Sequence, residues 1–260
     1  MKLKVFRYDK NTKKARHDLF EIKERPGTSV LSALFYVQEN LDDSLSFRHS
    51  CRGAVCGTCA MLINKVPRLA CKTQVSKLLL GKEEIDLKPY PSIEVTEPWN
   101  KKEEILIEPL PHLPMIKDLI VDMEKFFDNY RKIKPIFESA QKTQKNERLM
   151  KPDDVHKLEK YTNCVLCAAC FSSCPVNGRE KEYLGPAALA KLYRFYIDPR
   201  EEKKSHDLRL LSANDKSGWF GCEFYTNCMK VCPKGVTPNI AIGRARQELS
   251  KMEEHEGEEK

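Results

Sequence analysis

Apolar and polar residues alternate in short runs through the first hundred residues, a pattern typical of half-buried strands. The predicted strands are residues 2–8, 19–22, 60–63, 68–70, 85–87 and 93–95. The third and fourth runs predict a hairpin that turns at Asn64 and Lys65. Thr28 or Ser29 is expected to cap a helix whose apolar face lies within residues 30–37.

The second half of the chain has a helical pattern. Residues 89–114 are rich in proline, which interrupts regular structure and marks a domain boundary. Beyond it, apolar residues recur at steps of three and four along residues 116–130, which predicts a helix with one apolar stripe. Further predicted segments are helices at 186–196 and 239–252 and a loop at 141–151. We therefore expect an α+β chain with a β-rich domain over residues 1–105 and a helical domain over residues 106–260.

Charge and hydropathy exclude several classes of protein. Lys and Arg exceed Asp and Glu by seven, but the signs are mixed along the chain, which gives nucleic-acid binding little support. Apolar segments are too short to cross a bilayer, and the N-terminus has no apolar signal core. We expect a protein that is not exported and that reaches a membrane only through partners. In a reducing compartment its eleven cysteines indicate metal binding rather than disulfides.

The first group of cysteines has the spacing C-x4-C-x2-C-x11-C and consists of Cys51, Cys56, Cys59 and Cys71. Its first three members match the plant-type [2Fe–2S] arrangement. Gly53 and Gly57 are expected to supply the positive φ angles of a tight loop whose amides point at sulfur. A structural zinc site with four thiolates is the alternative, although such sites usually have two separated C-x2-C pairs.

The second group has the bacterial ferredoxin spacing C-x2-C-x2-C-x3-C before a proline and consists of Cys164, Cys167, Cys170 and Cys174. In two-cluster ferredoxins the fourth cysteine of such a run ligates the other cluster, so a second run is expected. That run consists of Cys222, Cys228 and Cys232, followed by Pro233. Tyr225 occupies the position at which its second cysteine would stand.

Exchange of the fourth cysteines assigns every remaining thiolate. One set predicts a [4Fe–4S] cluster and consists of Cys164, Cys167, Cys170 and Cys232. The other set has three thiolates, predicts a [3Fe–4S] cluster and consists of Cys174, Cys222 and Cys228. Zinc would leave three of the eleven cysteines unused. A second [4Fe–4S] cluster stays possible if a non-cysteine ligand completes it.

These combined motifs resemble the iron–sulfur subunit of succinate dehydrogenase and fumarate reductase. The matching segments are residues 50–53, 56–61, 113–122, 185–188 and 231–236. The resemblance implies an N-terminal β-grasp, plant-type [2Fe–2S] ferredoxin domain and a C-terminal all-α domain similar to bacterial ferredoxins. It implies that the chain relays single electrons and that catalysis takes place on another subunit.

The resemblance also implies partners and a location. A flavoprotein with FAD would interconvert succinate and fumarate, and an integral membrane anchor would hold quinone and, in some members, haem. The chain would lie on the cytoplasmic side of the inner membrane as a peripheral subunit. Electron-transfer subunits of glycolate, glycerol-3-phosphate or heterodisulfide enzymes are the alternative, but those typically carry Cys-Cys-Gly modules, and the sequence has no adjacent cysteines.

Quinone lies beside the [3Fe–4S] cluster in this family, which implies that certain residues face the anchor. These candidates are Pro175, Val176, Glu223, Lys234 and Arg246. Ubiquinone-linked members resemble C-P-S-x-x-W after the first run and carry His after the next cysteine. Here no Trp follows Cys174 at that spacing, and Glu223 and Arg246 replace a His and a Lys. These departures favour menaquinone and fumarate reductase.

Overall fold

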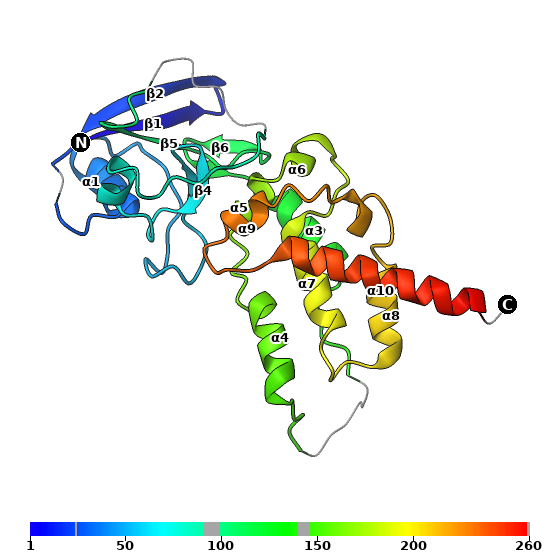
Figure 1. Cartoon of the computed structure of the whole chain (residues 1–260). Helices are drawn as coiled ribbons and strands as arrows, with labels where there is room; N and C mark the ends of the chain where they lie inside the picture. Colours follow the sequence, from blue (N-terminus) through cyan, green and yellow to red (C-terminus); the bar gives the residue numbers. More distant parts are fainter. Residues whose placement is uncertain (24, 91–98, 140–145, 259–260) are drawn as a thin grey trace.

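The computed structural model describes residues 1–23, 25–90, 99–139 and 146–258 of the chain. A sheet with one long helix forms the first part, and helices and loops form the second (Figure 1). The two parts lie side by side (Figure 1). At their junction Val66 of the first part packs with Ala169 and Val231 of the second, beside Cys167 and Cys170. The α+β class and the order of the two domain types are therefore as the sequence predicts.

Within the described residues, seven strands form one sheet in the order β4-β3-β5-β1-β6-β7, and β2 pairs with β1. The strands are β1 (Lys2–Asp9), β2 (Lys14–Glu21), β3 (Ala60–Ile63), β4 (Val66–Leu69), β5 (Glu104–Glu108), β6 (Met115–Lys117) and β7 (Ile120–Val121). β1 runs antiparallel to β2, with Lys2 opposite Glu21, and parallel to β5, with Leu3 opposite Ile105. Strands distant in sequence thus share one hydrophobic core with helix α1 (Val30–Asn40).

The local predictions for this half are largely confirmed. Ser29 caps α1, since its hydroxyl accepts a hydrogen bond from the amide of Ser32 at 3.1 Å. Asn64 and Lys65 turn the β3–β4 hairpin with φ angles of 48° and 63°. The short helix α2 (Val75–Leu79) follows the hairpin. Residues 85–87 form no strand, and residues 93–95 lie outside the described residues.

The expected boundary between residues 105 and 106 falls inside β5. The proline-rich stretch does not end the first domain, because β5 pairs with both β1 and β3 in the centre of the sheet. β6 and β7 then continue the same sheet. We propose that the first domain extends through Val121.

The long helix predicted along residues 116–130 is wrong in its first half. Met115–Lys117 and Ile120–Val121 are strands, and only α3 (Glu124–Lys132) is helical. Asp118 has a φ of 47°, which no helix accommodates. The apolar residues before α3 therefore match a helical period by coincidence and pack against the sheet instead.

The second half is built around α7. Its helices are α4 (Pro152–Thr162), α5 (Ala169–Ser172), α6 (Pro175–Arg179), α7 (Pro186–Tyr196), α8 (Lys203–Leu211), the 3-10 turn η1 (Trp219–Gly221), α9 (Asn227–Lys230) and α10 (Pro238–Glu258). α7 contacts α4, α8 and α10, and its buried residues form the centre of this core. The helix predicted at 186–196 is confirmed, and the one predicted at 239–252 is longer than expected. In the part of the chain that the structure describes, no helix has the length and hydropathy needed to cross a membrane.

A buried ionic network around Arg7 joins β1 to β2 and to the turn between β6 and β7. The guanidinium group of Arg7 in β1 donates hydrogen bonds to carboxylates of Asp18, Asp42 and Asp118. Bonds from the Ser44 hydroxyl and from Arg7 lower the pKa of Asp42 to about 2. Its stabilising charge is therefore fully present above about pH 4 and is lost as the pH falls through about 2.

Replacement of Asp118 tests this network. Its carboxylate, 2% exposed, accepts bonds from Arg7 Nε at 3.1 Å, the Tyr8 amide at 3.0 Å and the Ser46 amide at 2.9 Å. Asp118→Ala should lower the free energy of unfolding by about 3 kcal/mol, because it leaves buried donors without an acceptor. Thermal unfolding at pH 7 measures the change. Asp128→Ala, which removes an exposed partner of Arg131, is the control and should cost less than about 1 kcal/mol.

Candidate iron–sulfur centres

Backbone amides converge on the first cysteine of the N-terminal loop. The amides of Gly53, Val55 and Cys56 donate to Sγ of Cys51 at 3.4, 3.3 and 3.3 Å. Backbone N–H donors of this kind also surround iron-bound sulfur in proteins. Cys51 is exposed at the surface.

Positive φ angles shape this loop, but they do not lie at both of the expected glycines, Gly53 and Gly57. Gly57 has a φ of 75°, as predicted. Gly53 lacks a positive φ, and its neighbours Arg52 and Ala54 have φ angles of 55° and 58° instead. The expectation for Gly53 is therefore wrong, because its neighbours on either side make the turns that orient the amides.

Cys59, which directly precedes β3, and Cys71, which follows β4, complete this group. The Cys71 amide donates to Sγ of Cys59 at 3.5 Å. Burial raises the pKa of Cys59 to about 12, whereas hydrogen bonds, the first from the Thr58 hydroxyl, lower the pKa of Cys56 to about 6. The four thiols predicted for the first centre thus lie together, in unequal environments.

The two C-terminal cysteine runs share one backbone conformation. In the first run Leu166 and Ala168, on either side of Cys167, have φ angles of 52° and 61°. In the second run Phe224 and Thr226 have φ angles of 55° and 65°. A four-residue helix follows each, α5 and α9 respectively. Tyr225 lies between Phe224 and Thr226, just as Cys167 lies between Leu166 and Ala168. A tyrosine therefore occupies the structural position of Cys167.

Each run contributes its last cysteine to the other. One cavity, here the second centre, is lined by Cys164, Cys167, Cys170 and Cys232. Another cavity, here the third centre, is lined by Cys174, Cys222, Cys228 and Tyr225. Among the described residues no three His, Cys, Asp or Glu side chains are placed to hold one metal ion. The linings of the two cavities group the cysteines as the exchanged assignment predicts. Ligation of iron by these cysteines stays a prediction.

The donors of both cavities suit iron–sulfur clusters. Thiolates are the usual ligands of such clusters, and amides of Val236 and Phe224 donate to Sγ of Cys232 and Cys222 at 3.3 and 3.4 Å. Burial raises the pKa of Cys167 to about 12. Such thiols hold their protons at neutral pH, so metal binding must displace them.

Comparisons with known proteins agree with this geometry. A family model described as a 2Fe-2S iron-sulfur cluster binding domain matches residues 2–128, and one described as a 4Fe-4S dicluster domain matches residues 160–236. A fumarate reductase iron-sulfur subunit of Escherichia coli is 33% identical over 96% of this chain and 93% of its own. A mitochondrial succinate dehydrogenase [ubiquinone] iron-sulfur subunit of Dictyostelium discoideum is 33% identical over 95% of this chain and 81% of its own.

The chain belongs to the family of fumarate reductase and succinate dehydrogenase iron–sulfur subunits. A solved chain of the Mycobacterium smegmatis Sdh1 complex has the same fold, with a TM-score of 0.80, 23% identity and coverage of 96% of this chain and 95% of that one. This iron–sulfur subunit is therefore part of an oxidoreductase complex.

Three of the five residues expected at the anchor-facing edge lie around the third centre. Pro175, Val176 and Glu223 line the third cavity, and their place on the anchor-facing edge stays a prediction. The exposed carboxylate of Glu223 binds the guanidinium group of Arg179, which also interacts with the Tyr225 side chain. Glu223 therefore belongs to a polar group at the edge of this cavity.

The other two candidates have different surroundings. Lys234 lines the second cavity rather than the third, because it follows Cys232, which crosses to the second centre. Arg246 lies over the rings of Phe220 and Phe224 and donates to the carbonyl of Cys222 at 2.7 Å. Arg246 thus holds the loop that carries Cys222.

Sequence reasoning missed Tyr183 in this iron–sulfur subunit. Its side chain is 1% exposed and lines the third cavity together with Cys222. Burial raises the pKa of the Cys222 thiol, and the Tyr183 side chain opposes this rise. Asn129 of α3 holds the segment in place by donating to the carbonyls of Tyr183 and Leu184 at 3.1 and 3.0 Å. No cysteine lies near Tyr183 in sequence, so only the fold reveals it.

Removal of the Tyr183 hydroxyl should lower the reduction potential of the third centre. A hydroxyl that donates to an iron-bound thiolate stabilises the reduced, more negative form of the cluster. Tyr183→Phe should therefore lower the reduction potential of the third centre by tens of millivolts. For a one-electron reduction, about 59 mV corresponds to a tenfold change in the equilibrium constant. A redox titration followed by electron paramagnetic resonance measures this shift. Tyr161→Phe, at another buried tyrosine of the same core, is the control. Equal potentials for both variants would contradict a role for the Tyr183 hydroxyl.

Proposed function

We propose that this chain is the electron relay of a succinate/fumarate:quinone oxidoreductase. The observation that carries the proposal is the exchange of Cys174 and Cys232 between the two C-terminal cavities. When bound, [2Fe–2S], [4Fe–4S] and [3Fe–4S] clusters supply one-electron chemistry. The chain's own residues would hold the clusters through their thiolates and direct backbone amides at sulfur.

The complex would place this relay between two partners. A flavoprotein with FAD would carry the succinate or fumarate site, and an integral membrane anchor would carry the quinone site and, in some members of the family, haem. Relatives named for both reaction directions have the same identity to this chain, 33%, so they do not favour one direction. The chain would lie on the cytoplasmic side of the inner membrane through its anchor.

The third centre supports menaquinone as the electron carrier. Glu223 replaces the His of ubiquinone-linked members, and its carboxylate pairs with Arg179 at the cavity edge. An acidic side chain there accepts hydrogen bonds but donates none when ionised. We propose that this change, with the missing Trp after Cys174, adapts the site to menaquinone and favours fumarate reduction.

Serine substitutions of the two exchanged cysteines test the ligand assignment. Cys232→Ser should damage the [4Fe–4S] centre and spare the [3Fe–4S] centre, whereas Cys174→Ser should do the reverse. Electron paramagnetic resonance of oxidised and reduced complex, together with iron content, distinguishes the two signals. Each variant is the matched control of the other. If Cys232→Ser removed only the [3Fe–4S] signal, the exchanged assignment would be wrong.

Restoration of the missing thiolate tests the type of the third cluster. Tyr225 has the same backbone surroundings as Cys167, so Tyr225→Cys should place a fourth sulfur at the cavity. We expect loss of the [3Fe–4S] signal of the oxidised protein and appearance of a [4Fe–4S] cluster of lower potential, with about one more iron per chain. Tyr225→Ser should keep three irons. A wild-type protein without a [3Fe–4S] signal would contradict the proposal.

A further inference from the structure

The first cysteine loop touches the second centre at Gly57. A methyl group at Gly57 would lie 2.7 Å from the carbonyl oxygen of Val165 and 2.9 Å from Cβ of Cys167. Real Cβ atoms essentially never approach other atoms below 3.0 Å. Only glycine therefore allows the two loops to come this close.

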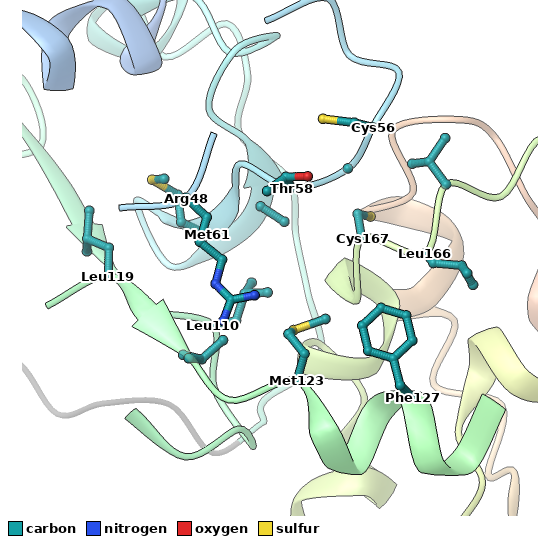
Figure 2. Close-up of a pocket in the computed structure, with 14 residues that line it drawn as sticks. Arg48, Cys56, Thr58, Met61, Leu110, Leu119, Met123, Phe127, Leu166 and Cys167 are labelled. Carbon is teal, nitrogen blue, oxygen red and sulfur yellow. The ribbon is translucent and has the colours of Figure 1, made fainter. Parts of the chain in front are cut away.

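This contact links two cysteines of different centres. Gly57 follows Cys56 directly in sequence and packs against the backbone and Cβ of Cys167. A cavity of about 320 Å³ flanks the contact. Figure 2 shows Cys56 and Cys167 on the loops that border it, with Met123, the residue before α3, and Phe127 of α3 on its other side. Side chains do not fill the space beside the loops, so the backbone contact sets their separation.

Other contacts keep the two domains from moving apart. The Asn227 side chain, 1% exposed, donates to the carbonyls of Lys88 and Ser173 at 2.9 and 2.8 Å and accepts from the Lys88 amide at 2.9 Å. Val66 of β4 packs with Ala169 of the helical domain. Because these contacts join the domains on neighbouring segments, a group inserted at Gly57 would have to push against them.

We propose that Gly57 is a positioning residue that sets the distance for electron transfer between the first and second centres. The inference rests on the proposed function. With clusters bound, one electron would pass from the first centre, which would be oxidised, to the second, which would be reduced; no proton would move and no bond would break. The reverse transfer has the same balance. A side chain at position 57 increases the distance and slows transfer in both directions.

The test uses the assembled complex and the magnetic interaction between its clusters. In the wild type, reduction of the second cluster should speed the spin relaxation of the reduced [2Fe–2S] cluster, an effect that falls steeply with distance. Gly57→Ala should diminish this enhancement, measured by microwave power saturation, and should slow electron transfer between the two clusters. The iron content and the separate signals of all three clusters should stay as in the wild type.

Two glycines supply matched controls. Gly235 lies shortly after Cys232, with a φ of 67° and nothing within 4 Å of an added Cβ. Gly235→Ala therefore adds backbone strain without a clash. Gly81, which follows α2 in the first domain, has a φ of 67° and nothing within 4 Å of an added Cβ, so Gly81→Ala also adds strain without a clash. Both should keep the wild-type enhancement. If Gly57→Ala does not accumulate, Gly57→Asn replaces it, because asparagine tolerates a positive φ and still carries a Cβ.

The outcomes are distinct. Wild-type relaxation enhancement in the Gly57 variant, or an equal loss in both controls, would overturn the inference. So would loss of the first cluster with the second intact, because Gly57 would then serve only its own loop. A wild-type complex without a [2Fe–2S] signal would instead refute the proposed function.

Discussion

The convergence of sulfur atoms from distant segments is the constraint on which the rest of the structure depends. Cys232 reaches the second cavity and Cys174 reaches the third, so neither C-terminal run can form its site alone. Each run must turn sharply to direct its side chains inward, which the paired left-handed residues around Cys167 and Tyr225 achieve. The helices around α7 then fix the two runs relative to each other.

The same constraint extends to the junction of the domains. The first loop packs on the second centre at Gly57. The Asn227 side chain donates hydrogen bonds both to Lys88 and to Ser173, the residue before Cys174 of the third centre. A rigid junction suits a relay, because electron transfer needs fixed distances and little rearrangement. Hydrogen bonds to sulfur, such as the one from the Phe224 amide to Cys222, are one influence on the potential of each centre.

Sequence patterns failed where local and tertiary preferences differ. The stripe from residue 116 onward fits a helical period, but sheet pairing of Met115–Lys117 overrides it. Proline-rich residues before β5 look like a boundary, yet Glu104–Glu108 returns to the centre of the sheet, a long-range pairing that no local pattern encodes. The positive φ expected at Gly53 moved to its neighbours for a similar reason, since the loop is shaped by its amide–sulfur contacts.

Cysteine spacing by itself predicted the three groups of thiols, the exchange of Cys174 and Cys232 and the missing fourth cysteine at position 225, because ligand geometry restricts how far apart in sequence neighbouring ligands can lie. Only the tertiary structure decided what surrounds them. Tyr183 at Cys222 and Gly57 against Cys167 arise from segments brought together by packing, which depends on the whole core rather than on any one stretch of sequence.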